Sequence, residues 1–299
     1  MRETELIDAI KSFANQTLAA KALIRGIGDD CAVLRPKPNQ DLVFTTDFTL
    51  EDRHFTLATH SGIDIGHKSL ARSLSDLAAM GADPVFCLVS LALPPSLGRA
   101  WIKNFYRGLT ALARKHRIML AGGDLASSDK IAIDVMCCGS VPQSTALLRS
   151  GAKPGDAIYV SGKLGGSALA LEQKRGASWK RHKRPEPRLD LGRALRGLAN
   201  SAMDLSDGLS LDLERLCRES HVGARLTSGI PRARGASIEQ VLHGGEDYEL
   251  LFTAGTRKTI PARIAGVPIT RIGEITNEAG TITYGGRILE PLGFDHFRS

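Results

Sequence analysis

Apolar residues follow two different spacings along the chain, and the two kinds of stretch alternate over its whole length. Alternating or continuous apolar runs predict β-strands at residues 42–46, 85–93, 131–141, 157–161, 224–227 and 249–253. Apolar residues at helical spacing predict helices at residues 65–80, 99–115 and 209–219. In the first of these helices Leu70, Leu74 and Leu77 lie on one face. Strands that alternate with helices are typical of the α/β class, in which layers of helix pack against sheet.

The length of 299 residues is sufficient for two domains that each bury a core. Residues 143–156, with the sequence QSTALLRSGAKPGD, connect two blocks of predicted elements through glycine and proline. We therefore expect one α/β domain over residues 1–142 and a second over residues 143–299.

The composition excludes several classes of protein. Hydrophobic residues at 42%, charged residues at 24% and aromatic residues at 5% are typical of a globular chain, not of a disordered or fibrous one. The longest apolar run, residues 85–93, is about half as long as a transmembrane helix, and the first residues are too polar for a signal peptide. We therefore expect a cytoplasmic protein. The five cysteines are odd in number and form no CxxC pair, which predicts buried, reduced thiols.

The net charge of +7 is concentrated in one segment. Residues 174–196 contain nine Lys or Arg and two acids, so this segment accounts for the net charge of the whole chain. Such a segment can be an RNA-binding patch, a loop that faces phosphate, or a solvated helix face. No aromatic-rich RNA-binding module accompanies it, which disfavours a nucleic-acid partner.

Aspartates recur after predicted strands and at glycine turns, where we expect each carboxylate to lie at a chain reversal. They stand in Gly-Asp-Asp at 28–30, Thr-Thr-Asp at 45–47, Gly-Gly-Asp at 122–124 and Met-Asp-Leu-Ser-Asp-Gly at 203–208. Asp76 lies inside a predicted helix among apolar neighbours, where an unpaired carboxylate is costly. Each aspartate alone is more typical of a turn or a helix cap. Together they favour a hard cation, above all Mg²⁺ with a phosphate ligand.

The common nucleotide and hydrolase motifs are absent from the sequence. The Gly162-Lys163 pair is followed by Leu164, so no P-loop is present, and the GxSxG and HExxH motifs are missing too. Residues 162–166 (GKLGG) nevertheless follow a predicted strand and open a helix, so their amides could approach a phosphate.

Several segments resemble the thiamine-monophosphate kinase family in sequence, order and spacing, over nearly the whole chain. They are GIGDDC at 26–31, TTD at 45–47, LSDLAAMGADP at 74–84, GGD at 122–124, RSGAKPGD at 149–156, DLSDG at 204–208, GGEDYEL at 244–250 and GFDHF at 293–297. The Gly-Asp pieces occur across the wider superfamily of aminoimidazole ribonucleotide synthetase, whereas LSDLAAMGADP, GGEDYEL and GFDHF are more specific.

The resemblance implies a two-domain α/β fold like that of aminoimidazole ribonucleotide synthetase, and a homodimer that pairs through its amino-terminal domains. It implies ATP-dependent phosphorylation of thiamine monophosphate to thiamine diphosphate by direct transfer, the last step of thiamine diphosphate biosynthesis. The amino-terminal domain would bind metal and ATP, and the carboxy-terminal domain would complete the ATP and substrate site. No dedicated catalytic side chain is implied, because metal ions and Arg149 would support the transfer.

By residue match, the resemblance assigns three sets of site residues. Mg²⁺ ions would be held by Asp30, Thr45, Thr46, Asp47, Asp76, Asp124, Asp204 and Asp207. ATP would meet Tyr106, Gly123, Asp124, Arg149 and Ser206. Thiamine monophosphate would meet His54, Glu246 and Phe294.

Two departures and two alternatives accompany this interpretation. Residues 49–54 are more charged than the family pattern, and the basic segment adds positive charge upstream of an HxxPxPR stretch at 182–188 that the family shares. Another ATP-dependent member of the superfamily, such as a hydrogenase maturation factor, selenophosphate synthetase or aminoimidazole ribonucleotide synthetase, is one alternative. The sequence ends DHFRS without a terminal cysteine and has no selenium-handling segment, which disfavours the first two. The other alternative is a non-enzymatic nucleic-acid-binding protein whose aspartates only cap turns.

Overall fold

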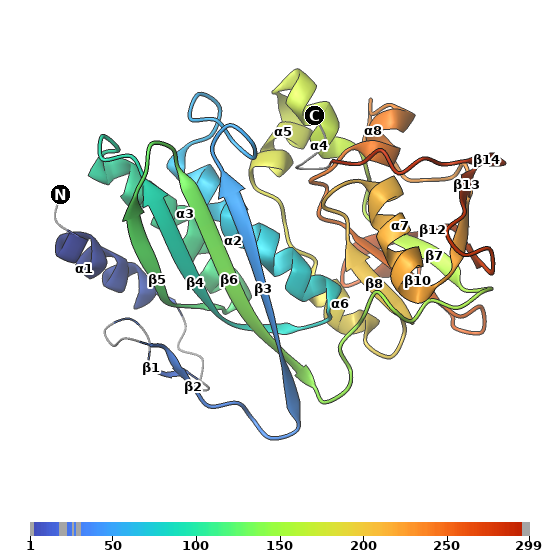
Figure 1. Ribbon diagram of the computed structural model, residues 1–299, viewed down its shortest axis with the longest axis horizontal. Helices are drawn as coiled ribbons and strands as arrows, with labels where there is room; N and C mark the ends of the chain where they lie inside the picture. The colour runs from blue at the N-terminus through green and yellow to red at the C-terminus, as the bar shows by residue number, and fades with distance from the viewer. Residues whose placement is uncertain (1–2, 18–22, 26, 28–30, 295–299) are drawn as a thin grey trace. The chain divides into compact units, whose positions relative to one another are not determined.

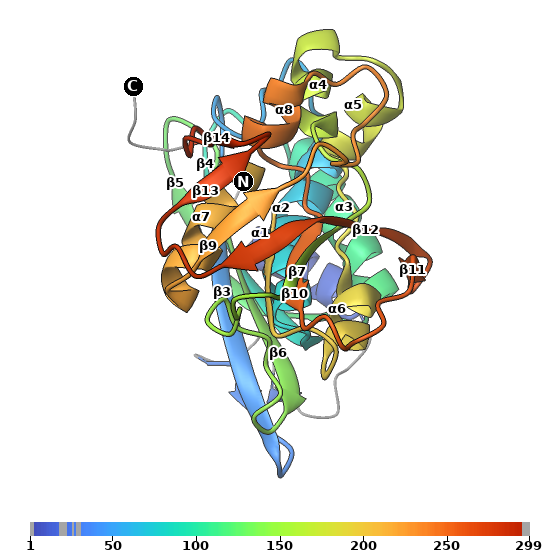
Figure 2. The same cartoon turned by 90° about the vertical axis from the view of Figure 1, so that its right-hand side faces the viewer.

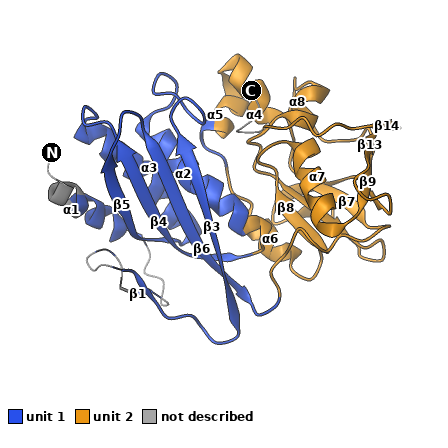
Figure 3. Ribbon diagram, in the orientation of Figure 1, with its two compact units in different colours: residues 1–77, 82–144, 183–185 blue, residues 78–81, 145–182, 186–299 orange. Residues whose placement is uncertain are grey.

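The computed structural model describes residues 3–17, 23–25, 27 and 31–294. The chain divides into two compact units (Figure 3). Unit 1 contains residues 1–77, 82–144 and 183–185, and unit 2 contains residues 78–81, 145–182 and 186–299. Each unit has its own sheet and is described by itself.

Unit 1 is built on a four-stranded sheet in the order β3-β6-β4-β5, with the helices α2 and α3 packed on one face (Figure 1). Its strands are β1 (Leu23–Arg25), β2 (Val33–Leu34), β3 (Gln40–Leu50), β4 (Asp83–Leu93), β5 (Met119–Ser127) and β6 (Ala132–Pro142). Its helices are α1 (Glu3–Ala14), α2 (Gly62–Ala79) and α3 (Arg99–His116). Strand β6 pairs antiparallel with β3 and β4, and β4 pairs parallel with β5.

The core of unit 1 forms where the apolar faces of the helices meet the sheet. Leu70, Leu74 and Leu77 of α2 are all buried, as their helical spacing predicts. Helix α2 begins with a reciprocal cap, since the Ser61 amide donates to Asp64 and the Asp64 amide donates to Ser61 Oγ at 3.2 Å. The apolar spacing and the cap together determine where this helix lies and where it starts.

Unit 2 contains a larger mixed sheet in the order β14-β13-β9-β12-β7-β10-β8, with β11 paired to β12 (Figures 1 and 2). Its strands are β7 (Ala157–Ser161), β8 (Ser201–Asp204), β9 (Gly223–Leu226), β10 (Leu250–Ala254), β11 (Arg263–Ile264), β12 (Val267–Thr276), β13 (Ile282–Tyr284) and β14 (Arg287–Ile288). Its helices are α4 (Gly166–Gln173), α5 (Gly176–Lys183), α6 (Leu189–Leu195), α7 (Leu209–Ser220) and α8 (Ile238–His243). Helices α4, α5 and α8 gather at one end of the strands (Figures 1 and 2).

The α/β prediction and the three predicted helices are confirmed, and each of the six predicted strands overlaps an observed one. Strand β5 is not predicted by the sequence pattern, because its Gly122-Gly123 pair is typical of a turn. In the structure Gly123 lies inside the strand, where a Cβ atom would stand 1.9 Å from the carbonyl oxygen of Val89 on β4. Only glycine allows β4 and β5 to approach this closely.

Two further expectations concern the cysteines and membranes. Cys87, Cys137, Cys138 and Cys217 are buried free thiols, whereas Cys31 is exposed, so the prediction of buried thiols is wrong for that residue.

Among the described residues no helix is both long enough and apolar enough to cross a membrane.

Candidate functional site

The predicted site residues divide between the two units. Unit 1 carries Thr45, Thr46, Asp47, His54, Asp76, Tyr106, Gly123 and Asp124. Unit 2 carries Arg149, Asp204, Ser206, Asp207, Glu246 and Phe294. Asp30, the remaining predicted metal ligand, lies outside the described residues. Within the part of the chain that is described, no three His, Cys, Asp or Glu side chains gather closely enough to form a metal cluster by themselves.

Asp47 and Asp124 of unit 1 do not lie at chain reversals, which corrects the sequence-based expectation for these two residues. Asp47 lies inside the eleven-residue strand β3, and Asp124 lies inside β5. Helix α2 supplies partners to two residues of β3: Arg72 donates to Asp47 Oδ1 at 3.2 Å, and Asp76 accepts a hydrogen bond from Thr45. Hydroxyl and carboxylate oxygens thus adjoin one another where β3 meets α2.

A second group of oxygens lies on neighbouring strands of the same sheet. Thr46 donates a hydrogen bond to Asp134, a residue that the sequence analysis did not select. The strand register places Asp134 beside Ser90, and Ser90 beside Asp124. Because paired residues of adjacent strands project to the same face, these three side chains form one row across β6, β4 and β5.

Unit 1 also contains a cavity of about 780 Å³. Its lining includes Tyr106, Gly123 and Asp124, three of the residues that the resemblance assigns to ATP, together with apolar residues of α1 such as Ile7 and Ile10. Tyr106 is buried and stacks on Phe13 with the ring centroids 5.8 Å apart. Burial raises the pKa of the Tyr106 hydroxyl far above its ordinary value, so this residue offers a ring and a neutral hydroxyl. A cavity lined by apolar side chains together with a few polar groups is typical of a small-molecule site.

His54 lies in the loop after β3 and is almost fully buried. Its Nδ1 accepts a hydrogen bond from the backbone amide of Leu50 at 3.0 Å. This bond assigns the ring proton of the neutral imidazole to Nε2, which is then a donor. The loop is held further by Lys68, whose Nζ donates to the carbonyl oxygen of His54 at 2.9 Å.

Three distant segments of unit 2 meet through backbone hydrogen bonds. The amide of Glu246 donates to Ser206 O at 2.7 Å, and the amide of Phe294 donates to Asp207 O at 2.8 Å. Tyr248 donates to Leu205 O at 2.9 Å in the same way. Residues assigned separately to metal, nucleotide and substrate therefore lie side by side in this unit.

Asp207 is held by a charged pair on α7 that the sequence analysis missed. Arg215 Nη1 lies 2.5 Å from Asp207 Oδ2 and 3.1 Å from Asp212 Oδ1. The buried Asp212 carboxylate also accepts hydrogen bonds from the backbone amides of Asp207 and Gly208, at 3.0 and 3.1 Å. Burial, reinforced by the nearby Asp207 charge, raises the pKa of Asp212 to about 7. Asp204, at the end of β8, is buried as well.

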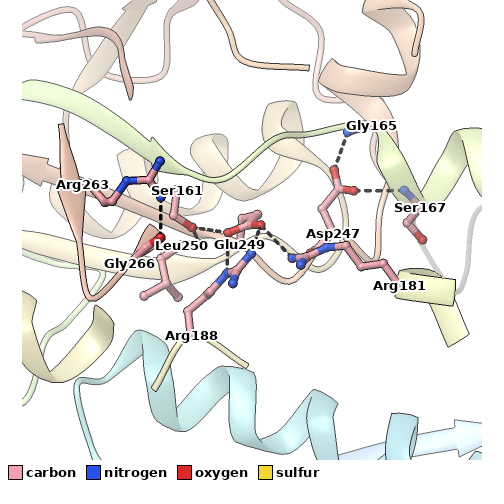
Figure 4. Close-up of polar contacts among 10 residues, drawn as sticks. All are labelled: Ser161, Gly165, Ser167, Arg181, Arg188, Asp247, Glu249, Leu250, Arg263 and Gly266. Carbon is pink, nitrogen blue, oxygen red and sulfur yellow. Dashed lines mark hydrogen bonds and ion pairs between the residues drawn. The ribbon is translucent and has the colours of Figure 1, made fainter. Parts of the chain in front are cut away.

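Three amides of the GKLGG segment, those of Gly162, Leu164 and Gly165, already donate to other residues of unit 2, which disfavours the phosphate interpretation. The Asp247 carboxylate accepts hydrogen bonds from the backbone amides of Gly165, at 2.6 Å, and Ser167, at 3.1 Å. A side chain of this protein therefore already caps α4 (Figure 4). Burial raises the pKa of Asp247 to about 7, against the lowering effect of these two hydrogen bonds. The start of α4 is therefore a structural contact.

The basic segment is largely structural too. The buried Glu249 carboxylate accepts hydrogen bonds from the guanidinium groups of Arg181, at 2.7 Å, and Arg188, at 2.5 and 2.8 Å (Figure 4). Lys183 and Arg184, which belong to unit 1, form ion pairs with Asp64 of the same unit at 3.2 and 2.6 Å. None of the three interpretations drawn from the sequence anticipated these buried ion pairs. One signal was present, since Glu249 stands directly before an apolar strand and a buried carboxylate requires a cationic partner.

Arg149 is not brought to the other site residues of unit 2 by any contact described for its side chain. The side chain is exposed, and its carbonyl oxygen accepts a hydrogen bond from Ser220 Oγ at 2.7 Å. The structure leaves its proposed phosphate contact as a prediction.

Comparisons with known proteins identify the family. Residues 28–141 match the family model "AIR synthase related protein, N-terminal domain", and residues 153–285 match the corresponding C-terminal domain. The chain is 41% identical to thiamine-monophosphate kinase of Escherichia coli (strain K12), with 91% of each chain covered.

Two solved structures are similar in fold and sequence. Thiamine-monophosphate kinase from Stenotrophomonas maltophilia K279a is 35% identical, with a TM-score of 0.83 and 97% of this chain and 98% of that chain covered. The structure described as AaThiL complexed with AMPPCP and TMP is 32% identical, with a TM-score of 0.80 and 99% of both chains covered. Both domain models and full-length relatives thus agree, and the chain belongs to the thiamine-monophosphate kinase family.

Proposed function

We propose that this protein transfers the terminal phosphoryl group of ATP directly to thiamine monophosphate and so forms thiamine diphosphate. The convergence of Ser206, Asp207, Glu246 and Phe294 in unit 2 is the observation that carries the proposal. These residues come from three segments that are distant in sequence, and each segment belongs to a motif of the family. The acceptor is the phosphate of the substrate, which is largely ionised near neutral pH, so no strong general base is required.

The cavity of unit 1 supports a nucleotide site. Tyr106, Gly123 and Asp124 line it, and the apolar side of α1 suits a flat base. The structure of the relative that contains AMPPCP, an ATP analogue, covers 99% of this chain and supports the same function. Arg149 and Ser206 are proposed to meet the phosphates from unit 2.

Magnesium is proposed on the chemistry of the donor set. Thr45, Asp47 and Asp76 provide hydroxyl and carboxylate oxygens where β3 meets α2, and hard cations prefer such ligands. With Thr46, Asp124, Asp204, Asp207 and Asp30, these residues would hold the Mg²⁺ ions. When bound, the ions would neutralise the negative charge that develops on the phosphoryl oxygens.

The substrate contacts follow from side-chain chemistry. Glu246 offers a carboxylate to an amino group or to the cationic thiazolium ring, and Phe294 offers an aromatic face to either ring. Phe294 is 43% exposed and so is accessible to a ligand. His54 would contribute its Nε2–H as a hydrogen-bond donor.

A homodimer that pairs through unit 1 belongs to the same proposal. Phe44 and Phe48 of β3 are 61% and 59% exposed, although large aromatic side chains on a sheet face are usually covered. Sedimentation at micromolar concentration should find a dimer, and the double substitution Phe44→Asp with Phe48→Asp should shift it to the monomer. The cytoplasm remains the predicted location.

The decisive assay combines purified protein, ATP and Mg²⁺ with and without thiamine monophosphate, and detects thiamine diphosphate by chromatography. Product should disappear with a chelator and fall by at least about a hundredfold in Asp47→Asn, because a cation ligand is lost. Asp129→Asn, an exposed position in the same unit, is the matched control and should retain activity. ATP binding without any thiamine diphosphate would overturn the substrate assignment.

A further inference from the structure

His182 of α5 lies at the centre of a contact network around Glu246, the carboxylate proposed above to bind thiamine monophosphate. Its Nδ1 is 2.7 Å from Ser167 Oγ and 3.5 Å from Glu246 Oε2. The imidazole is buried and stacks on Trp179, with ring centroids 5.2 Å apart and an interplanar angle of 12°. Stacking restricts the ring orientation, so Nδ1 stays directed at both oxygens.

The two oxygens determine where the ring proton lies. A lone pair on Nδ1 would repel the Glu246 carboxylate, whereas an N–H group at that position attracts it. The Ser167 hydroxyl can accept as well as donate, so it is compatible with a proton on Nδ1. The arrangement favours an Nδ1–H group that donates to Ser167 Oγ at 2.7 Å and makes a longer electrostatic contact, of 3.5 Å, with Glu246 Oε2.

The backbone that carries Glu246 is held from the same basic segment. Glu246 and Tyr248 have φ angles of +61° and +49°, in the left-handed region that residues other than glycine rarely adopt. Such a conformation persists only where its surroundings hold it. Asp247 between them is fixed on the start of α4, and Glu249 after them is fixed by Arg181 and Arg188 (Figure 4).

We propose that His182 is a positioning residue for thiamine monophosphate. Its Nδ1–H group orients Glu246 so that the 20% of this side chain that remains exposed faces the amino or cationic group of the substrate. Arg181 and Arg188 hold the backbone in place, while His182 contacts one carboxylate oxygen of Glu246 and the Tyr248 hydroxyl donates to the other, at 3.5 Å. This inference rests on the proposed function, and it gives the HxxPxPR stretch a role in recognition of the organic part of the substrate.

A pair of amide variants tests the position of the donor. In His182→Asn the side-chain amide nitrogen can take the place of Nδ1, whereas in His182→Gln it reaches the region of Nε2. His182→Gln should raise the KM for thiamine monophosphate by about fivefold, since the donor that faces the Glu246 carboxylate is lost, and His182→Asn should stay within about twofold of wild type. In both variants kcat and the KM for ATP should remain near wild type. Lys180→Gln, exposed on the same helix, is the matched control.

The outcomes separate the possible failures. Equal increases in the KM for thiamine monophosphate in both variants, or a parallel change in kcat and in the KM for ATP, would assign His182 a purely structural role and overturn the proposal. If neither variant folds, Ser167→Ala replaces them: it leaves the Nδ1–H group to Glu246 alone, so the KM should not rise, and a rise overturns the proposal. If the wild-type protein forms no thiamine diphosphate, the proposed function fails and this inference falls with it. If the wild type is active but His182→Gln keeps its KM, only the inference fails.

Discussion

The hydroxyl group of Thr45 on β3 donates a hydrogen bond to the carboxylate of Asp76 on α2, across 31 residues of sequence. This bond connects two of the proposed metal ligands and orients the helical one. It also explains how Asp76 is accommodated in a helix whose other face is buried and apolar.

Thr45→Val should weaken activation by Mg²⁺ without unfolding the protein. Valine has nearly the shape of threonine and suits a strand, so only the hydroxyl oxygen and its hydrogen bond are lost. We expect the Mg²⁺ concentration for half-maximal activity to rise roughly tenfold, in line with the loss of one hydrogen bond to a charged group. A magnesium titration of the activity checks this, with Thr45→Ser as the control that keeps the hydroxyl. An unchanged titration in Thr45→Val would remove Thr45 from the proposed metal site.

Arg215→Met should destabilise unit 2, because Asp212 is fully buried and loses its cationic partner. Without the cation the buried Asp212 must either carry an uncompensated charge or take up a proton, and we expect a cost of about 2 kcal/mol in the free energy of unfolding. Urea unfolding measures it. Arg218→Met is the matched control on the same helix, since the Arg218 side chain is 65% exposed and its contact with Glu214 spans 3.7 Å. A control effect as large as that of Arg215→Met would contradict the assignment.

The stability of unit 1 should decrease in acid through Asp64. Burial by itself would raise the pKa of Asp64, but hydrogen bonds from Ser61 and Arg184 and the charge of Arg184 outweigh it and lower the pKa from 3.8 to about 2. A depressed pKa in the folded state stabilises the protein above the pKa of the unfolded state, and this contribution is lost as the pH falls towards the folded value. The contribution is about 2 kcal/mol above pH 4 and disappears between about pH 4 and pH 2.

Asp64→Asn measures this contribution directly. The variant should be less stable than wild type at neutral pH and should lose less stability between about pH 4 and pH 2. Unfolding by urea at a series of pH values provides the comparison. Parallel stability curves for the two proteins would show that Asp64 does not contribute in this way.

Asp247→Ala should lower stability and leave ATP affinity unchanged. The substitution removes the acceptor of the Gly165 and Ser167 amides, and unpaired buried amides cost about 1–3 kcal/mol. Asp247→Asn keeps an oxygen acceptor and should lie between the alanine variant and wild type. Thermal unfolding measures the stability of the variants, and calorimetry measures their affinity for ATP. A loss of ATP affinity in proportion to the loss of stability would indicate that the start of α4 binds phosphate.

Local patterns in the sequence were sufficient for helices α2, α3 and α7, though not for α1, and for the approximate location of six strands, because apolar spacing depends only on which residues follow one another. The same patterns failed at β5. Its two glycines are locally indistinguishable from a turn, and they become a strand only because β4 lies close enough to pair with them.

The family and the types of the proposed site residues could be predicted from motifs, because each motif is a contiguous segment of the chain. The partners of those residues did not. Asp247 meets Ser167 across 80 residues, Glu249 meets Arg188 across 61, and Thr46 meets Asp134 across 88. A charged or polar group is buried only where another segment satisfies it, and which segment does so is decided when the chain folds. The sequence alone thus determined which chemical groups are available, and the tertiary structure decided that a helix start is filled by Asp247 and that a basic segment holds Glu249.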